Sequence, residues 1–260
     1  CVIIETDGKD EWIDLHPVKN YQQLDATDLR NLIRHAGIVG LGGAAFPTAV
    51  KLNPGPAHKI ETVIFNGAEC EPYITCDDML MRERADEIIS GIQISLHALN
   101  TDKGIIAIES NKAEAIGALK QAIKKSNITN VKVTSIPTLY PTGGEKQLIK
   151  VITGNEVPSN GLPADIGVIV QNVGTMAAIH QAIHFGKPLI SRIVTITGKG
   201  IKKPQNLDTL IGTPMSTLIS QCGGYKENAD HLVMGGPMMG FTLSTDQLPV
   251  IKGCNSLVVE

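Results

Sequence analysis

Residues 62–109 read TVIFNGAECEPYITCDDMLMRERADEIISGIQISLHALNTDKGIIAIE, and this stretch decides the fold. It opens with a short apolar run at 62–66 (TVIFN) and closes with another at 104–109 (GIIAIE). Between them, residues 77–99 carry apolar side chains at helical spacing, which predicts one long amphipathic helix. A strand, a helix and a second strand are typical of two parallel strands joined by a crossover helix.

The same alternation continues on both sides of this unit. Further strands are predicted at 131–136 and 167–171, and helices at 28–36, 112–125, 144–151 and 174–184. Thr27 is in position to cap the first of these helices. Alternating strands and helices favour an α/β fold with a mainly parallel sheet flanked by helices.

The pattern changes after Pro188. Strands are predicted at 193–197 and 231–234, with a short helix between them that opens at Thr213. These elements favour a small α+β module that ends in a C-terminal strand. The predicted organisation is an irregular lead-in at 1–26, an α/β domain at 27–188 and the small module at 189–260.

Composition limits the partners of the chain. Its 260 residues include 42% hydrophobic and 19% charged residues, with a net charge of −3, which is typical of a globular protein. Nothing in this balance indicates nucleic acid, and no apolar run is long enough for a direct membrane span. Five cysteines without C-x-x-C spacing predict reduced thiols, a cytoplasmic setting and no metal site within this chain. Cys1 stands where Met would begin a complete chain, so we expect a piece of a longer protein.

A glycine-rich turn at 40–48 (GLGGAAFPT) is the first of four turns at strand ends or helix starts. Gly40, Gly42 and Gly43 let the backbone approach a ligand, and free N–H groups at a helix start attract phosphate. Lys51 lies one turn further on and can reach the same anion. The preceding residues are predicted helical, so this is not the dinucleotide fingerprint that follows a strand. The alternative is a flexible connection between two helices.

The other three turns are less specific taken singly. At 66–72 (NGAECEP), Glu69 and Glu71 offer acceptors to a ligand or form a solvated acidic turn, and Cys70 between two carboxylates is no nucleophile. A third turn at 140–148 (YPTGGEKQL) leads into a helix. In the fourth, at 170–175 (VQNVGT), Asn172 or Thr175 caps the next helix or holds a phosphate or polyol.

Together and in this order, the four turns resemble one family. GIVGLGGAAFPTAVKL, NGAECEPYITCDDMLMRE, YPTGGEKQLIKVITGNEVP and GLPADIGVIVQNVGT are similar to segments of the C subunit of the Rnf-type (Rsx) ion-translocating electron transport complex. More distantly, they resemble the FMN- and NADH-binding subunit of respiratory complex I. The trailing module resembles the β-grasp-like SLBB domain that follows the flavin domain in both families.

The resemblance implies an NADH:acceptor oxidoreductase module in which hydride passes between NADH and FMN, with no catalytic side chain required. By matching position it assigns FMN binding to Gly40, Gly42, Gly43, Lys51, Asn66, Glu69, Cys70, Tyr140, Gly143, Glu145, Gln171, Asn172 and Thr175. It assigns the NADH side to Phe46, Glu71 and Tyr140.

The resemblance also implies features outside this chain. The full-length family member carries two [4Fe-4S] clusters that receive the electrons. It works with the other subunits of the complex, peripherally on the cytoplasmic side of the inner membrane, and the complex couples electron flow to ion translocation.

Three departures from the complex I pattern support an alternative. Leu41 replaces an arginine, Ala68 replaces an acid, and Gly144 replaces the first of two glutamates. Each change removes a polar contact with FMN or NADH. The alternative is therefore a non-enzymatic docking or scaffold subunit that has lost flavin or NADH binding.

Overall fold

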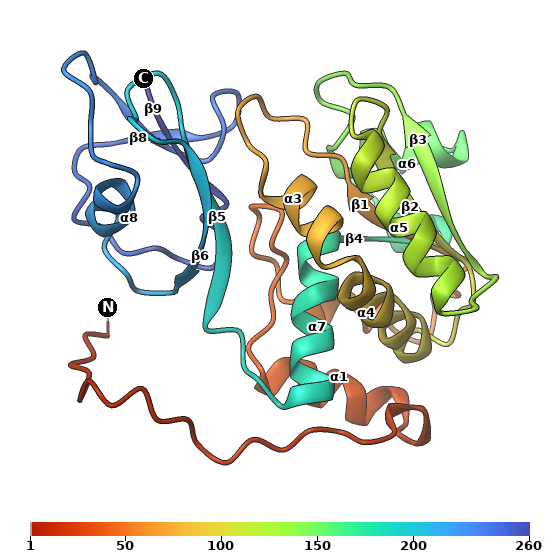
Figure 1. Ribbon diagram of the computed structural model, residues 1–260. Coiled ribbons are helices and arrows are strands. Elements are labelled where there is room, and N and C mark those ends of the chain that lie inside the picture. Colours follow the sequence, from red (N-terminus) through yellow and green to blue (C-terminus); the bar gives the residue numbers. More distant parts are fainter. Residues whose placement is uncertain (1) are drawn as a thin grey trace.

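The computed structural model describes residues 2–260, so the interpretation of Cys1 concerns a residue outside this range. The first module is built on a four-stranded sheet of order β3-β2-β1-β4, in which all neighbours are parallel (Figure 1). Its strands are β1 (Thr62–Gly67), β2 (Gly104–Glu109), β3 (Val131–Ile136) and β4 (Val168–Asn172). The parallel α/β fold expected from the sequence is confirmed.

Helices cover both faces of this sheet. One face packs against α1 (Ala26–His35), α3 (Cys76–Glu83), α4 (Ala85–Ala98), α5 (Ala113–Lys125) and α7 (Val173–Phe185). The other face packs against α6 (Glu145–Thr153) and the 3-10 turn η2 (Pro163–Ile166). The buried Phe65 side chain belongs to the first core and its neighbour Ile64 to the second, as the alternation of a strand requires.

Two local predictions are wrong. The single helix expected at 77–99 is interrupted at Arg84, whose φ of −125° and ψ of 34° lie outside the helical region. The break redirects the chain so that α4 packs closely on α7, where a Cβ at Gly91 would lie 1.9 Å from the carbonyl oxygen of Met176. The cap of α1 is Asp25, not Thr27, because the Asp25 carboxylate accepts hydrogen bonds from the N–H groups of Thr27 and Asp28.

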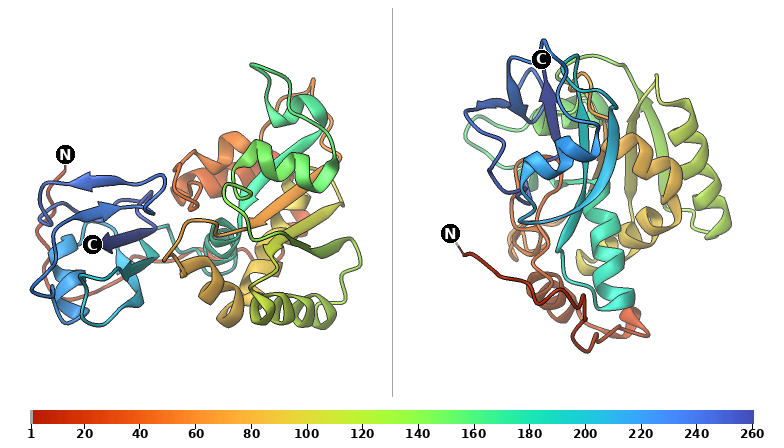
Figure 2. Two further views of the ribbon diagram at one scale, coloured as in Figure 1. Left: turned by 90° about the horizontal axis from the view of Figure 1, so that it is seen from above. Right: turned by 60° about the vertical axis from the view of Figure 1, so that its left-hand side comes forward.

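The second module has its own sheet and its own core. The sheet has the order β6-β5-β9-β7-β8 and packs against α8 (Met215–Gln221). Its strands are β5 (Ser191–Thr197), β6 (Gln205–Leu210), β7 (Leu232–Met234), β8 (Phe241–Leu243) and β9 (Ser256–Val259). Strand β9, the expected C-terminal strand, is central because it pairs in parallel with β5 and antiparallel with β7. Figure 2 shows the two modules side by side.

The lead-in runs along the outside of both modules before the 3-10 turn η1 (Tyr21–Gln23) (Figures 1 and 2). Residues 2–20 form no helix or strand, and α1 begins at Ala26, the last residue of the lead-in. The N–H of Val18 donates to the carbonyl of Ile183 at 2.8 Å, and the Lys187 ammonium lies 5.8 Å from the centre of the Trp12 ring. These contacts attach the lead-in to the end of α7.

Candidate functional site

A cavity of about 600 Å³ lies beside the edge of β4. Within residues 2–260, β4 pairs with β1 on one side and has no strand on the other. The nine sequence-predicted residues that line this cavity are Gly40, Gly42, Phe46, Lys51, Asn66, Gly143, Glu145, Gln171 and Asn172. The cavity therefore brings together residues from all four turns, and its volume is within the range of small-molecule sites.

The glycine-rich turn closes one side of the cavity. Its backbone folds back on itself, with the N–H of Gly40 donating to the carbonyl of Phe46 at 2.8 Å. Gly43 has a φ of +114°, a conformation that side chains disfavour. The short helix α2 (Thr48–Lys51) follows directly and carries Lys51 into the cavity wall.

Lys51 is paired across the cavity wall. Its ammonium lies 2.5 Å from a carboxylate oxygen of Glu145, the first residue of α6. The side chains are 30% and 39% exposed, so water screens this pair and its contribution to stability is small. Both groups remain accessible to a ligand from the cavity.

Two buried polar atoms at this site have no hydrogen-bond partner in the structure. They are the side-chain nitrogen of Gln171 and the hydroxyl oxygen of Thr48. Leaving a buried donor unpaired costs about 1–3 kcal/mol, so such atoms need an explanation. Gln171 lines the cavity, and Thr48 begins the helix that carries Lys51. A polar ligand in the cavity would give the Gln171 nitrogen a partner.

Asn172 caps the N-terminus of α7, which is one of the two roles predicted for it. Its side-chain oxygen accepts from the N–H groups of Gly174 at 2.8 Å and Thr175 at 3.3 Å, at the start of α7. Its amide nitrogen donates to Asp77 at 2.6 Å. Thr175 is fully buried outside the cavity lining, and its hydroxyl accepts from the N–H of Leu41 at 3.0 Å. It holds the glycine-rich turn in place.

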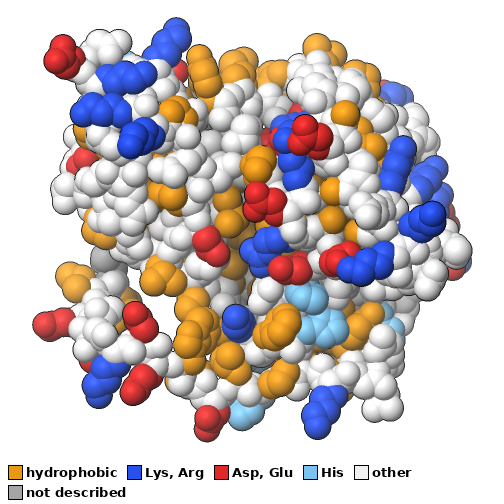
Figure 3. Space-filling view, in the orientation of Figure 1, with side chains coloured by type: hydrophobic (Ala, Val, Ile, Leu, Met, Phe, Trp, Pro, Cys, Tyr) orange, Lys and Arg blue, Asp and Glu red, His pale blue; other side chains and the backbone are white. Residues whose placement is uncertain are grey.

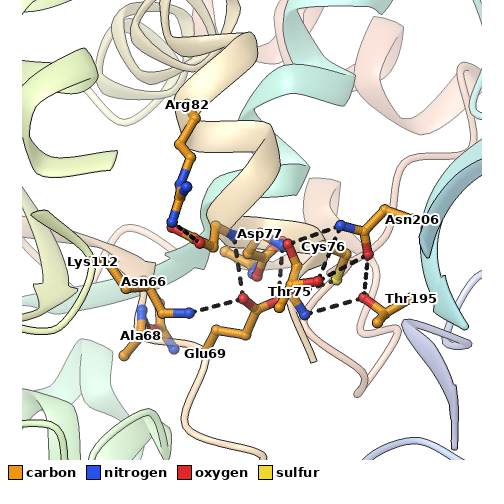
Figure 4. A network of polar contacts seen from close by, with 12 residues as sticks. Asn66, Ala68, Glu69, Thr75, Cys76, Asp77, Arg82, Lys112, Thr195 and Asn206 are labelled. Atoms are coloured by element: carbon orange, nitrogen blue, oxygen red, sulfur yellow. Dashed lines mark hydrogen bonds and ion pairs between the residues drawn. The ribbon is translucent and has the colours of Figure 1, made fainter. Parts of the chain in front are cut away.

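Glu69 does not line the cavity, and its carboxylate lies at the start of α3 (Figure 4). Its carboxylate accepts from the N–H groups of Asp77 at 2.8 Å and Asp78 at 3.2 Å. The Lys112 ammonium lies 3.2 Å away, and both side chains of this ion pair are at most 10% exposed. Glu69 is thus a buried cap of α3, and its four lone-pair directions are largely used by the protein itself.

Asp77 is a charged residue of this region that the sequence reasoning missed. Burial, followed by the charge of Glu69, raises the pKa of the Asp77 carboxyl to about 7, while its hydrogen bond to Asn172 acts in the opposite direction. An acid in the first turn of a helix is ordinary, so the sequence carried no signal beyond the pair Asp77 and Asp78.

The remaining predicted residues surround the cavity without lining it. Glu71 accepts from the N–H of Met238 in the second module at 2.9 Å, and its other oxygen is buried without a partner. Burial and then the charges of Glu109 and Glu71 raise the pKa of the Cys70 thiol, which agrees with the expectation that it is no nucleophile. The other residues of this group are Gly43, Tyr140, Glu69 and Thr175.

Several lining residues carried no sequence signal. They are Ala44, Val50, Asn53, Pro54, His58, Leu162, Pro163, Ala164, Val168, Ile169 and Val170. The β4 residues line the cavity because an edge strand presents its backbone along its whole length. That position depends on strand order, which spacing in a sequence does not reveal.

A second hollow lies between the two modules, where Figure 3 shows hydrophobic side chains gathered and charges of both signs around them. It measures about 360 Å³, and its lining includes Asp77 and Arg192. Within residues 2–260 no cluster of three or more metal-ligating side chains occurs. In the same range, no helix has both the length and the apolar character needed to cross a membrane.

The chain matches two families in sequence. Residues 33–181 match the Nuo51 FMN-binding domain, and residues 193–242 match the SLBB domain. The chain is 48% identical, over 99% of its length, to the C subunit of the proton-translocating ferredoxin:NAD(+) oxidoreductase complex of Clostridium ljungdahlii, and spans 56% of that protein. It is also 48% identical to the C subunit of the ion-translocating oxidoreductase complex of Pseudomonas aeruginosa, and spans 33% of it. The resemblance to this family seen in the sequence is confirmed.

Solved structures support the same fold. A chain of an NAD+-reducing [NiFe]-hydrogenase in the H2-reduced state matches 94% of this chain with a TM-score of 0.79, at 18% sequence identity. The match covers 49% of the hydrogenase chain. At this identity the likeness shows a shared fold.

Proposed function

The chain belongs to the family of the Nuo51 FMN-binding domain, and on that premise we propose that it binds FMN beside β4 and exchanges hydride with NAD(H). The single observation that carries the proposal is the unpartnered nitrogen of Gln171 in the wall of a cavity lined from all four turns. The donors and acceptors of a flavin ring would supply what Gln171 and the free edge of β4 lack.

The other lining residues fit the rest of the group. Gly40 and Gly42 bring backbone to the cavity without side chains, and Lys51 offers a cation for a phosphate. FMN, when bound, supplies the hydride-accepting ring, so the protein contributes position, electrostatics and exclusion of water. Phe46, which lines the cavity and is 49% exposed, is placed to stack on an incoming nicotinamide.

The wider role follows from the names of the relatives. They are subunits of complexes that move protons or ions and act as oxidoreductases. We extend this to the present chain as a peripheral subunit on the cytoplasmic side of the inner membrane, which works with other subunits. In the longer protein, two [4Fe-4S] clusters outside this chain would receive the electrons. The chain spans about half or less of the length of the relatives named above, so this role belongs to the whole protein.

One observation favours the alternative of a docking or scaffold subunit. Lys51 is the only lysine or arginine that lines the cavity among residues 2–260, and its charge is already paired with Glu145. The side chain of Leu41, where complex I has an arginine, is buried in the core and adds no cation. A phosphate would have to displace the carboxylate of Glu145 from Lys51.

Retention of FMN separates the two functions. The purified chain is incubated with FMN and desalted, and the bound flavin is measured by its visible absorption. We expect the parent chain to retain FMN and Lys51→Ala to retain much less, because it lacks the cation. Lys120→Ala, an exposed lysine on α5, is the control that retains as much as the parent. A parent chain that retains no flavin would support the scaffold function instead.

A further inference from the structure

Two cationic side chains of the second module hydrogen-bond to the backbone within and just before the glycine-rich turn. The Arg192 guanidinium donates to the carbonyl of Leu41 at 3.0 Å, and the Lys252 ammonium donates to the carbonyl of Gly37 at 2.5 Å. Arg192 also donates to the carbonyls of Lys252 and Ile193. Within residues 2–260 neither cation forms a salt bridge with a carboxylate.

This arrangement is costly for the fold alone. Arg192 is 5% exposed, and burial lowers the pKa of its guanidinium and that of the Lys252 ammonium. A buried cation that meets only neutral carbonyls recovers less of its hydration energy than one paired with a carboxylate. The hydrogen bonds of the two cations hold the carbonyl groups of Leu41 and Gly37 in place.

The turn is also enclosed on its other sides. The N–H of Leu41 is held by Thr175 of α7, so both backbone groups of Leu41 are fixed. A Cβ at Gly253 in the second module would lie 3.1 Å from the carbonyl oxygen of Gly43. Gly37 has a φ of +67°, and a Cβ there would lie 2.7 Å from the Lys252 ammonium. The segment therefore has little room to move between the two modules.

The second module also hydrogen-bonds to the acidic turn and to Thr75 just after it (Figure 4). The N–H of Thr75 donates to the Thr195 hydroxyl at 3.2 Å, and the Thr75 hydroxyl donates to Asn206 at 3.2 Å. The N–H of Met238 donates to Glu71 at 2.9 Å. Two of the four turns are thus anchored from outside the module that contains the cavity.

We propose that the second module is a brace that sets the shape of the cavity, with Arg192 and Lys252 as positioning residues for the glycine-rich turn. The identity of the ligand as FMN rests on the proposed function, whereas the brace itself does not. Lys252 is the better residue to test, because removing its ammonium group leaves the hydrogen bonds of Arg192 intact.

The test compares Lys252→Met with the parent chain. Methionine keeps an aliphatic chain of similar length and removes the charge and the hydrogen bond to Gly37. Lys226→Met, at an exposed position of the same module, is the matched control, and Lys252→Arg tests rescue by a second cation. Amide hydrogen exchange is measured in a peptide covering residues 37–47, and FMN affinity is measured by quenching of flavin fluorescence.

We expect exchange in residues 37–47 of Lys252→Met to be about tenfold faster, with α5 unchanged, because one anchor of the turn is lost. We expect FMN affinity to fall about tenfold and Lys252→Arg to recover most of it. Unchanged amide hydrogen exchange in residues 37–47 of Lys252→Met would overturn the proposal that the second module braces the turn. Exchange that rises equally in α5 would also overturn it, because the role of Lys252 would then be one of general stability.

The two proposals fail in different ways. If the parent binds FMN and Lys252→Met binds it equally well, the brace does not position the ligand, and the proposed function stands. If the parent binds no FMN, the proposed function fails, while hydrogen exchange still decides whether the second module holds the turn.

Discussion

The wall of the cavity and the neighbouring buried pair Glu69 and Asp77 differ in how their polar groups are used. Gln171 in the cavity wall, and Thr48 at the start of the adjoining helix α2, have buried polar atoms with no partner in the protein. Glu69 and Asp77 in the neighbouring region are satisfied by backbone N–H groups, Lys112 and Asn172. A buried polar group without a partner beside a cavity indicates a place for a ligand. A buried polar group that the protein itself pairs indicates a structural role. The predicted site therefore has two parts, a cavity wall that binds the ligand and a set of buried residues that stabilise the fold beside it.

The largest expected effect is on stability, at Glu69. In Glu69→Ala, Lys112 is left buried without its carboxylate, and the first N–H groups of α3 lose their acceptor. We expect the free energy of unfolding to fall by about 3–5 kcal/mol. Denaturant unfolding of the protein without FMN measures it.

Glu114→Ala is the control, because Glu114 forms an ion pair with Arg82 but is 76% exposed. It changes the free energy of unfolding little. If Glu69→Ala were as stable as the control and lost only FMN affinity, Glu69 would bind the ligand, and its assignment to the structural part of the site would be wrong.

The second effect is the pH dependence caused by Asp77. Its pKa is about 7 in the folded protein and near 3.8 in the unfolded chain, so the folded state binds a proton more tightly between these values. Stability is therefore highest when Asp77 is protonated, and the free energy of unfolding falls as pH rises from about 4 to about 7. At about 1.36 kcal/mol per pKa unit, a shift of this size corresponds to roughly 4 kcal/mol over that pH range.

Asp77→Asn removes this contribution and keeps an oxygen that accepts from Asn172. The charged groups that act on Asp77 are Glu69, Arg192 and Lys112, and they are present in both proteins. The difference in unfolding free energy between variant and parent, measured from pH 5 to pH 8, should therefore grow in favour of the variant. A difference that does not depend on pH would show that Asp77 stays ionised, as an exposed carboxylate would.

Much of the fold follows from the sequence, and less of the site does. The bounds of β2 and β3 are those predicted, because each strand is a short run with turn residues on both sides. Strand β6 (QNLDTL) was missed because it alternates few apolar side chains, and β5 supplies its pairing partner from elsewhere in the chain. The turns at strand ends were found because their glycines and polar residues are local signals.

The direction of each side chain in those turns was not predictable. Glu69 and Glu71 are two residues apart, yet one caps α3 and the other meets the second module. These partners are far away in sequence, so only the packed structure decides which carboxylate faces a ligand.

The third effect concerns Gln171, in the part of the site that binds the ligand. In Gln171→Met, the nitrogen that lacks a partner is replaced by an apolar group of similar length. We expect the protein without FMN to gain up to about 1 kcal/mol in unfolding free energy, because a buried unpaired donor is removed. We expect FMN affinity to fall about tenfold, which corresponds to about 1.4 kcal/mol. Thermal unfolding with and without FMN measures both changes, and a loss of stability without FMN would mean that Gln171 already has a structural role.

The smallest effect on stability is expected at the Lys51–Glu145 pair. This pair is intermediate between the ligand-binding and the structural groups, because its charges are paired with each other yet remain accessible. Glu145→Gln keeps a hydrogen-bond acceptor near Lys51 and removes the negative charge. Since both side chains are about a third exposed, the free energy of unfolding should change by less than about 0.5 kcal/mol. The released cation should bind the phosphate of FMN more tightly, by about two- to threefold. Fluorescence titration decides the point, because a fall in affinity would mean that the carboxylate of Glu145 itself contacts the ligand and that the pair serves binding from both sides.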